Sequence, residues 1–239
     1  MQQDVYARHI ENEKKHWWFS ARREIVYSFL KKIKKKKNFT ILDFGSGSGT
    51  NVEMLSSFGK VDLFEKNLKA RLHLKYRFKK KNIKIINKIK KKNYDFILVA
   101  DVLEHIRDDK KAIKEFLQYL RKDGHILITV PAFNFLFSSK DKALKHYRRY
   151  RTSDITDLLK KYFQIKKISY FNFFLFIPIA LSIFFMKLKK EKFIDFAETT
   201  PFYPINFILK KIFYIEKFFL RFIKFPFGIS IIALAKKND

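Results

Sequence analysis

The feature that most constrains this chain is a run of glycines that directly follows an apolar segment. Gly45, Gly47 and Gly49 come after the apolar residues 39–42, and a helical pattern follows them. Glycine has no Cβ and adopts positive φ without strain, so such a turn between a strand and a helix lets the backbone approach a nucleotide-like ligand. A dinucleotide fingerprint has its third glycine one position later, where this chain has Thr50. A ligand with a pyrophosphate is therefore not favoured.

Strand and helix patterns alternate after this turn. Further strands are predicted at 61–65, 83–86, 95–100, 126–130, 164–170 and 229–235, and helices at 51–58, 109–120, 152–162 and 205–225. Strands that alternate with helices predict an α/β fold with a parallel sheet covered on both faces.

The chain divides into four parts. Residues 1–37 form an N-terminal helical leader, 38–170 the core, 171–225 an apolar insertion, and 226–239 return to the core as its last strand. The leader contains an aromatic and basic tract at 16–23. We expect this tract either to close over the ligand site or to present a platform to a substrate; the alternative is that it anchors the first helix by apolar packing.

Carboxylates stand at the ends of the first two predicted strands. Glu65 follows Gly45 by about 20 residues, the position from which a carboxylate accepts both hydroxyls of a bound ribose. Asp43 lies within the first apolar run, where burying a carboxylate is costly unless something satisfies it. A cationic or amino-bearing end of a ligand would do so.

Together with the run 94–106, these features resemble the class I S-adenosylmethionine-dependent methyltransferases. The resemblance covers about residues 39–170 and the final strand. It implies a seven-stranded, mostly parallel sheet with helices on both faces and S-adenosyl-L-methionine as cofactor. It also implies the cofactor-binding residues: Asp43, Gly45, Ser46, Gly47 and Gly49 at the methionine end, Glu65 at the ribose, Asp101 lining the pocket, and Asn87 where many members place an acidic residue near the adenine.

Two histidines are candidate catalytic residues. Methyl transfer from a sulfonium depends chiefly on positioning, and only some acceptors need a base. His105 and His146 could remove a proton near neutral pH, although His105 could equally cap a helix and His146 could be part of the surface. The chain has no cysteine, and its six histidines show no metal-ligand spacing, so no metal site is predicted.

The insertion and the charge bear on the acceptor. Residues 170–186 carry no charge, and Asn206, Lys210, Lys217, Arg221 and Lys224 fall in one stripe of an otherwise apolar helix. Such a helix can lie in a bilayer interface. A transmembrane span and a cap or dimer face are the alternatives. Lys and Arg number 52 against 23 Asp and Glu, a net charge of +29, which favours anionic lipid or nucleic acid as a partner.

We therefore expect a methyltransferase that acts on a hydrophobic or lipid-linked acceptor, such as a lipid, a polyprenyl-linked sugar or a quinone precursor. The polar N-terminus of the sequence resembles no secretory signal, so the predicted location is cytoplasmic, peripheral on the inner face of the membrane. The first rival is an RNA or DNA methyltransferase, favoured by the positive charge. The second is a non-enzymatic membrane adaptor with a degenerate cofactor domain.

Overall fold

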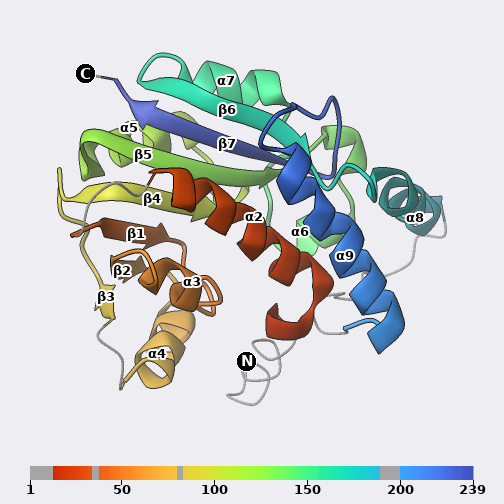
Figure 1. Ribbon diagram of the computed structural model, residues 1–239, viewed down its shortest axis with the longest axis horizontal. Helices are drawn as coiled ribbons and strands as arrows, with labels where there is room; N and C mark the ends of the chain where they lie inside the picture. Colours follow the sequence, from red (N-terminus) through yellow and green to blue (C-terminus); the bar gives the residue numbers. More distant parts are fainter. Residues whose placement is uncertain (1–12, 34–37, 80–82, 189–199, 239) are drawn as a thin grey trace.

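The computed structural model describes residues 13–33, 38–79, 83–188 and 200–238, which form one seven-stranded sheet with helices on both faces (Figure 1). The strand order is β3-β2-β1-β4-β5-β7-β6. The strands are β1 (Thr40–Phe44), β2 (Lys60–Phe64), β3 (Lys84–Ile86), β4 (Tyr94–Ala100), β5 (Leu120–Pro131), β6 (Phe163–Phe171) and β7 (Ser230–Lys237). The predicted fold class is confirmed, including the return of the chain to the sheet as its last strand.

The first five strands are parallel, so their carboxyl ends meet at one edge of the sheet. Strand β7 is antiparallel to both of its neighbours, β5 and β6. Because the loops after β1, β2 and β4 leave from the same edge, the residues at the ends of these strands are brought together there.

Helices cover both faces of the sheet (Figure 1). They are α2 (Trp17–Ile33), α3 (Val52–Ser56), α4 (Leu68–Arg77), α5 (Asp109–Tyr119), α6 (Ser139–Ala143), α7 (Thr152–Leu159), α8 (Phe176–Leu188) and α9 (Tyr203–Phe219), with two 3-10 turns, η1 (Leu103–His105) and η2 (Asn134–Leu136). Helices α2 and α9 cross one face, and α5 and α7 cover the other (Figure 1). Helix α8 lies at the end of the molecule, beyond the sheet (Figure 1).

Several elements differ from the sequence-based prediction, and helices α6 and α8 were not predicted at all. Strand β5 begins at Leu120 rather than at 126, because a register shift opposite β4 lets Leu120 pair with Tyr94 despite the turn-like residues between. Helix α4 was not predicted from its basic sequence, and it begins where the Asn67 side chain accepts hydrogen bonds from the N–H groups of Lys69 and Ala70. Helix α9 ends at Phe219 rather than at 225.

Helix α9 packs against α2 through its polar stripe, which corrects the predicted orientation. The Asn206 amide accepts a hydrogen bond from Trp17 N at 2.9 Å and donates one to Lys15 O at 3.0 Å. Lys217 is also buried, 3.3 Å from the Glu24 carboxylate. The stripe was expected to face anionic lipid head groups. These two members of it instead face the leader helix, because they find partners there, and the apolar side of α9 is left exposed.

Helix α8 buries none of its residues completely. The uncharged run at 170–186 begins as the end of β6, as expected, and continues into α8 after a short turn. Among the described residues, no helix is both long and apolar enough to cross a membrane. The transmembrane alternative is therefore not supported by the described helices.

Candidate active site

The glycine turn has the conformation that its sequence predicts. Gly45, Gly47 and Gly49 have φ of +77°, +53° and +80°. The N–H groups of Gly45 and Ser46 both donate to Phe64 O, at 2.8 and 3.2 Å, so the turn is fastened to the end of β2. At Gly47, the place that a Cβ would take has no other heavy atom within 4 Å. The turn thus presents bare backbone to an open space at the edge of the sheet.

Glu65 closes the turn from the other side. Its carboxylate accepts hydrogen bonds from Gly47 N and Asn67 N, both at 2.8 Å. Each carboxylate oxygen has a second lone pair, so the group can still accept hydrogen bonds from two hydroxyls. This is the capacity that the predicted role at a ribose requires.

Asp43 is a buried carboxylate with unmet hydrogen-bonding capacity. Its side chain is 1% exposed, and Oδ2 has no hydrogen-bond partner among the described residues. Burial raises the pKa of Asp43 to about 7, against the opposing positive charge of Arg22. An ammonium group placed beside Oδ2 would satisfy this carboxylate and stabilise its ionised form.

Arg22 is the site residue whose role the sequence did not reveal. It extends from α2 and forms a buried ion pair with Asp101, which also accepts a hydrogen bond from Thr129 Oγ1 at 2.9 Å. Burial lowers the pKa of Arg22 to about 10, which leaves it charged at neutral pH. The sequence did contain one signal for this role. Arg22 precedes Ile25 by about one helical turn, so it puts a charge on the apolar face of the helix.

The aromatic tract of the leader anchors α2 and also brings Arg22 into the site. Trp18 stacks on Phe213 of α9, with ring centroids 5.2 Å apart, and on Phe171 at the end of β6. At the start of the described chain, the Glu13 carboxylate accepts a hydrogen bond from Ser48 Oγ in the glycine turn. The leader therefore contacts the turn directly.

These groups fit S-adenosylmethionine. Asp43 offers an orphaned buried oxygen for the ammonium group, Arg22 a cation for the carboxylate, Glu65 acceptors for the ribose, and Gly47 room for close approach. Asn87, the predicted adenine contact, is exposed just after β3, at the same edge of the sheet. The remaining predicted residue, Ser46, is buried and donates through Oγ to Asp43 O at 2.8 Å.

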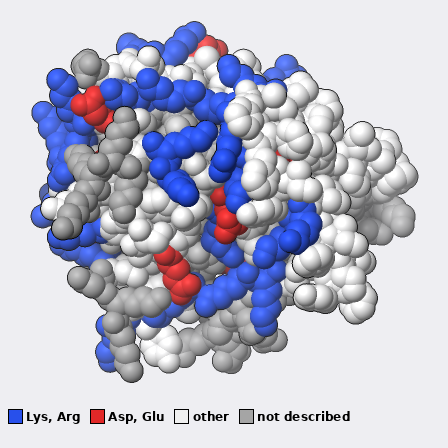
Figure 2. Space-filling model, viewed as in Figure 1, with Lys and Arg blue, Asp and Glu red and all other residues white. Residues whose placement is uncertain are grey.

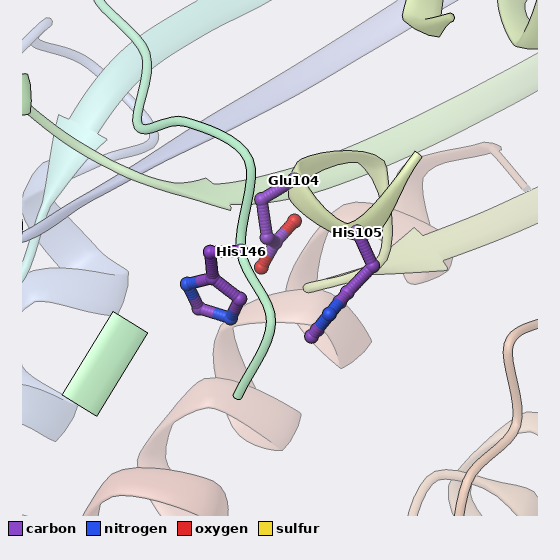
Figure 3. Close-up of side chains that lie close together, drawn as sticks. All are labelled: Glu104, His105 and His146. Atoms are coloured by element: carbon purple, nitrogen blue, oxygen red, sulfur yellow. The ribbon is translucent and has the colours of Figure 1, made fainter. Parts of the chain in front are cut away.

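The two predicted catalytic histidines lie side by side. The His105 and His146 rings meet edge to face with centroids 4.5 Å apart, and the Glu104 side chain lies next to them (Figure 3). Burial, together with the charge of His146, lowers the pKa of His105 to about 4, so His105 is neutral at pH 7. The sequence could not reveal this contact, because His146 arrives from the connection after β5.

Asp141 fixes the orientation of His146. Asp141 Oδ1 lies 2.9 Å from His146 Nδ1, and both carboxylate oxygens also accept hydrogen bonds from Arg149 at 2.9 Å. Burial alone would raise the pKa of Asp141, but the hydrogen bonds from His146 and Arg149 outweigh it and hold the pKa below the ordinary value. Asp141 is thus an anion that accepts a hydrogen bond from the Nδ1–H group of His146 and leaves the Nε2 lone pair free to accept a proton.

Comparisons with known proteins agree with this site. A family model described as a methyltransferase domain matches residues 9–170. A ubiquinone biosynthesis O-methyltransferase of Pelagibacter ubique is 28% identical over 165 residues, which cover 59% of this chain and 68% of that protein. An uncharacterized protein of Methanocaldococcus jannaschii is 32% identical over 112 residues, which cover 45% of this chain and 47% of the relative, or about half its length.

A solved structure has the same fold. A putative methyltransferase of Bacillus halodurans superposes with a TM-score of 0.58 at 16% identity, over 89% of this chain and 99% of that one. The family model covers more than half of the present chain and includes the glycine turn, Glu65 and the histidine pair. The chain therefore belongs to the class I S-adenosylmethionine-dependent methyltransferases.

Proposed function

We propose that the protein transfers the methyl group of S-adenosylmethionine to a hydrophobic acceptor at the surface of an anionic membrane. The acceptor class comprises lipids, polyprenyl-linked sugars and quinone precursors. The observation that carries this proposal is an exposed apolar face on the two helices of the insertion. The face comprises Ile177, Leu181, Phe184, Phe185 and Leu188 of α8 and Ile205, Phe207, Ile208, Ile215, Phe218 and Phe219 of α9.

An apolar face of this size needs a covering. Large side chains that are about half exposed follow one another along both helices, and exposed apolar patches of this kind mark contact sites for membranes or proteins. Figure 2 shows this end of the molecule as mostly uncharged atoms bordered by lysines and arginines. Lys211 is exposed in the middle of α9, and Arg221 and Lys224 are exposed just beyond its end. Apolar rings with a basic border complement acyl chains below anionic head groups.

A half-open hollow in the α8 part of this face suits an apolar acceptor. It has a volume of about 260 Å³ and lies between α8 and η2, lined mainly by apolar residues that include Phe135, Leu136, Leu181 and Phe184. The connection that follows η2 continues to His146. The tail of an acceptor in this pocket would thus contact the connection that carries His146. The name of the Pelagibacter relative, which concerns ubiquinone, agrees with a hydrophobic aromatic acceptor.

The chain's own groups have two tasks in this reaction. The Asp43, Glu65 and Arg22 side chains hold the cofactor at the edge of the sheet, which places its methyl group for an in-line displacement. His146 accepts, through Nε2, the proton of an acceptor whose nucleophile is a hydroxyl. His105 lies beside it but is a weak base at neutral pH, because burial lowers its pKa to about 4. When bound, S-adenosylmethionine supplies the electrophilic methyl group.

The first test is calorimetric titration with S-adenosylmethionine, followed by transfer of a labelled methyl group to a lipid extract. We expect saturable binding by the wild type and its loss in Gly47→Arg, because the new side chain fills the open space beside the turn. Label should enter the lipid fraction. Absence of binding by the wild type would leave the adaptor hypothesis, and labelling of RNA in place of lipid would favour the nucleic acid hypothesis.

A further inference from the structure

The site holds three potential metal ligands, Glu104 and the two histidines. A ring nitrogen that binds a metal cannot also accept a proton, so this inference is an alternative to the role of the histidines as bases. Glu104 and His105 belong to η1, directly after β4, and His146 belongs to the connection after α6. Figure 3 shows the three side chains close together. We propose that Glu104, His105 and His146 form a binding site for a divalent transition-metal cation of the Zn²⁺ class.

The spacing of the ligand atoms is close to what such an ion requires. One nitrogen or oxygen atom from each residue lies within 4.8 Å of the others. Zn²⁺ binds nitrogen and carboxylate oxygen at about 2.0–2.2 Å, so two ligand atoms of one tetrahedral ion are about 3.4 Å apart. Binding therefore requires the ligand atoms to approach one another by up to about 1.4 Å, a shift that side-chain rotation can supply.

Glu104 provides an independent reason to expect a cation. Its side chain is 1% exposed, and Oε2 has no hydrogen-bond partner among the described residues. A buried polar atom without a partner is costly, and such atoms in native proteins call for an explanation. The nearby cations Arg22 and Arg149 are engaged by Asp101 and Asp141 respectively. An ion bound to Glu104 would satisfy the free oxygen.

His146 has the second partner that metal-binding histidines usually have. Its Nδ1 lies 2.9 Å from the Asp141 carboxylate, which fixes the tautomer and leaves the Nε2 lone pair for a metal. Arg149 holds Asp141 in place through two hydrogen bonds. A carboxylate–histidine pair in this arrangement also makes the imidazole a better ligand.

The two ligand-bearing segments are fixed to each other. Tyr147 N donates to Glu104 O at 2.8 Å, and His146 N donates to Asp141 O at 2.8 Å. The backbone thus holds the cluster without a metal. Two histidines and one carboxylate form a ligand set typical of zinc sites that keep a coordination position open.

The test is titration of the metal-free protein with Co²⁺, whose visible absorption reports its coordination, and then with Zn²⁺ as competitor. We expect about one tight site per chain in the wild type, with absorption typical of nitrogen and oxygen ligands. Glu104→Gln and His146→Ala should weaken Co²⁺ binding by at least about tenfold, the loss that even a second-shell substitution causes. His125→Gln, in the amino-terminal half of β5, is the matched control and should bind as the wild type does.

The controls separate metal binding from folding and from cofactor binding. Circular dichroism of each metal-free variant checks the fold. Titration with S-adenosylmethionine checks the cofactor site, because none of the three metal ligands is among the residues assigned to the cofactor. Glu104→Gln preserves side-chain volume, so it tests the site even if His146→Ala unfolds. The proposal would be overturned if the wild type had no tight Co²⁺ site. It would also be overturned if Glu104→Gln bound Co²⁺ as strongly as the wild type does, or if only His125→Gln lost binding.

Discussion

Strand β4 and helix α8 are both apolar segments, yet they lie in opposite environments. Every residue of β4 except Ala100 is buried, whereas no residue of α8 is. Both faces of β4 are covered because it lies in the middle of a parallel sheet. Helix α8 leaves the sheet at the end of β6, and among the described residues it contacts the turn η2 and, through Phe176, the Phe227 ring. An apolar sequence therefore predicts that a segment packs against another apolar surface. Only the topology determines whether that surface is the protein's own core or a separate partner.

Helix α9 shows the same contrast on its two sides. Its polar residues Asn206, Glu216 and Lys217 are buried, and its phenylalanines and isoleucines are largely outside. The Glu216 carboxylate accepts a hydrogen bond from Phe174 N at 3.0 Å, so it fastens the start of the insertion. The helix is thus held to the domain by polar contacts and by the buried Phe213 ring, and its remaining apolar side is available to a partner.

The largest expected effect compares a phenylalanine from each region. Phe96 of β4 is fully buried and Phe185 of α8 is 56% exposed. Phe96→Ala should lower the free energy of unfolding by about 3–5 kcal/mol, because it leaves a cavity. Phe185→Ala should change it by less than about 0.5 kcal/mol. Urea denaturation measures both, and similar losses in the two variants would mean that α8 belongs to the core after all.

The next effect concerns membrane binding by the exposed region. Ile177→Asp combined with Phe185→Asp should weaken sedimentation with phosphatidylglycerol vesicles by more than about tenfold, since each side chain would otherwise bury apolar area worth about 1 kcal/mol. The matched control is Leu72→Asp on α4, because Leu72 is 55% exposed and lies outside the apolar face. Equal losses in both proteins would show that general hydrophobicity, rather than this face, drives the binding.

A smaller effect tests the connection between α9 and the leader. Asn206→Leu removes the hydrogen bonds to Trp17 N and Lys15 O, and it leaves a buried N–H without a partner. We expect a loss of about 1–3 kcal/mol in the free energy of unfolding. We also expect weaker binding of S-adenosylmethionine, because α2 carries Arg22. Stability lost with cofactor affinity unchanged would separate α9 from the site.

The smallest effect concerns Asp43, a carboxylate within the buried sheet. Asp43 has a pKa of about 7, raised from its ordinary value, so it is mostly neutral at pH 6 and mostly ionised at pH 8. If its anion meets the ammonium group of the cofactor, affinity should rise over this range by up to about tenfold. Asp43→Asn should remove that part of the pH dependence. Calorimetric titrations of both proteins at the two pH values measure the difference, and parallel profiles would contradict the role of Asp43.

The sequence predicted what local patterns encode. Alternating apolar runs predicted the positions of the strands along the chain, and the three glycines predicted the turn with its positive φ angles. The contact between His105 and His146 and the ion pair of Arg22 with Asp101 join distant segments, so no local spacing indicated them. The outward apolar side of α9 was predicted, but not that its polar stripe is buried, because that depends on the partners that α2 provides.

The position of β7 has a consequence for the order in which the molecule can assemble. Strands β5 and β6 precede it in the chain, yet each pairs with β7 and not with the other. Until β7 has been synthesised, both strands therefore have an unpaired edge, and such edges can pair with other chains and cause aggregation. The contacts between β5 and β7 also span many residues, which slows folding. Completion of the sheet thus depends on the residues that leave the ribosome last among those described here, and mutations in β7 should reduce yield more than their effect on the folded state suggests.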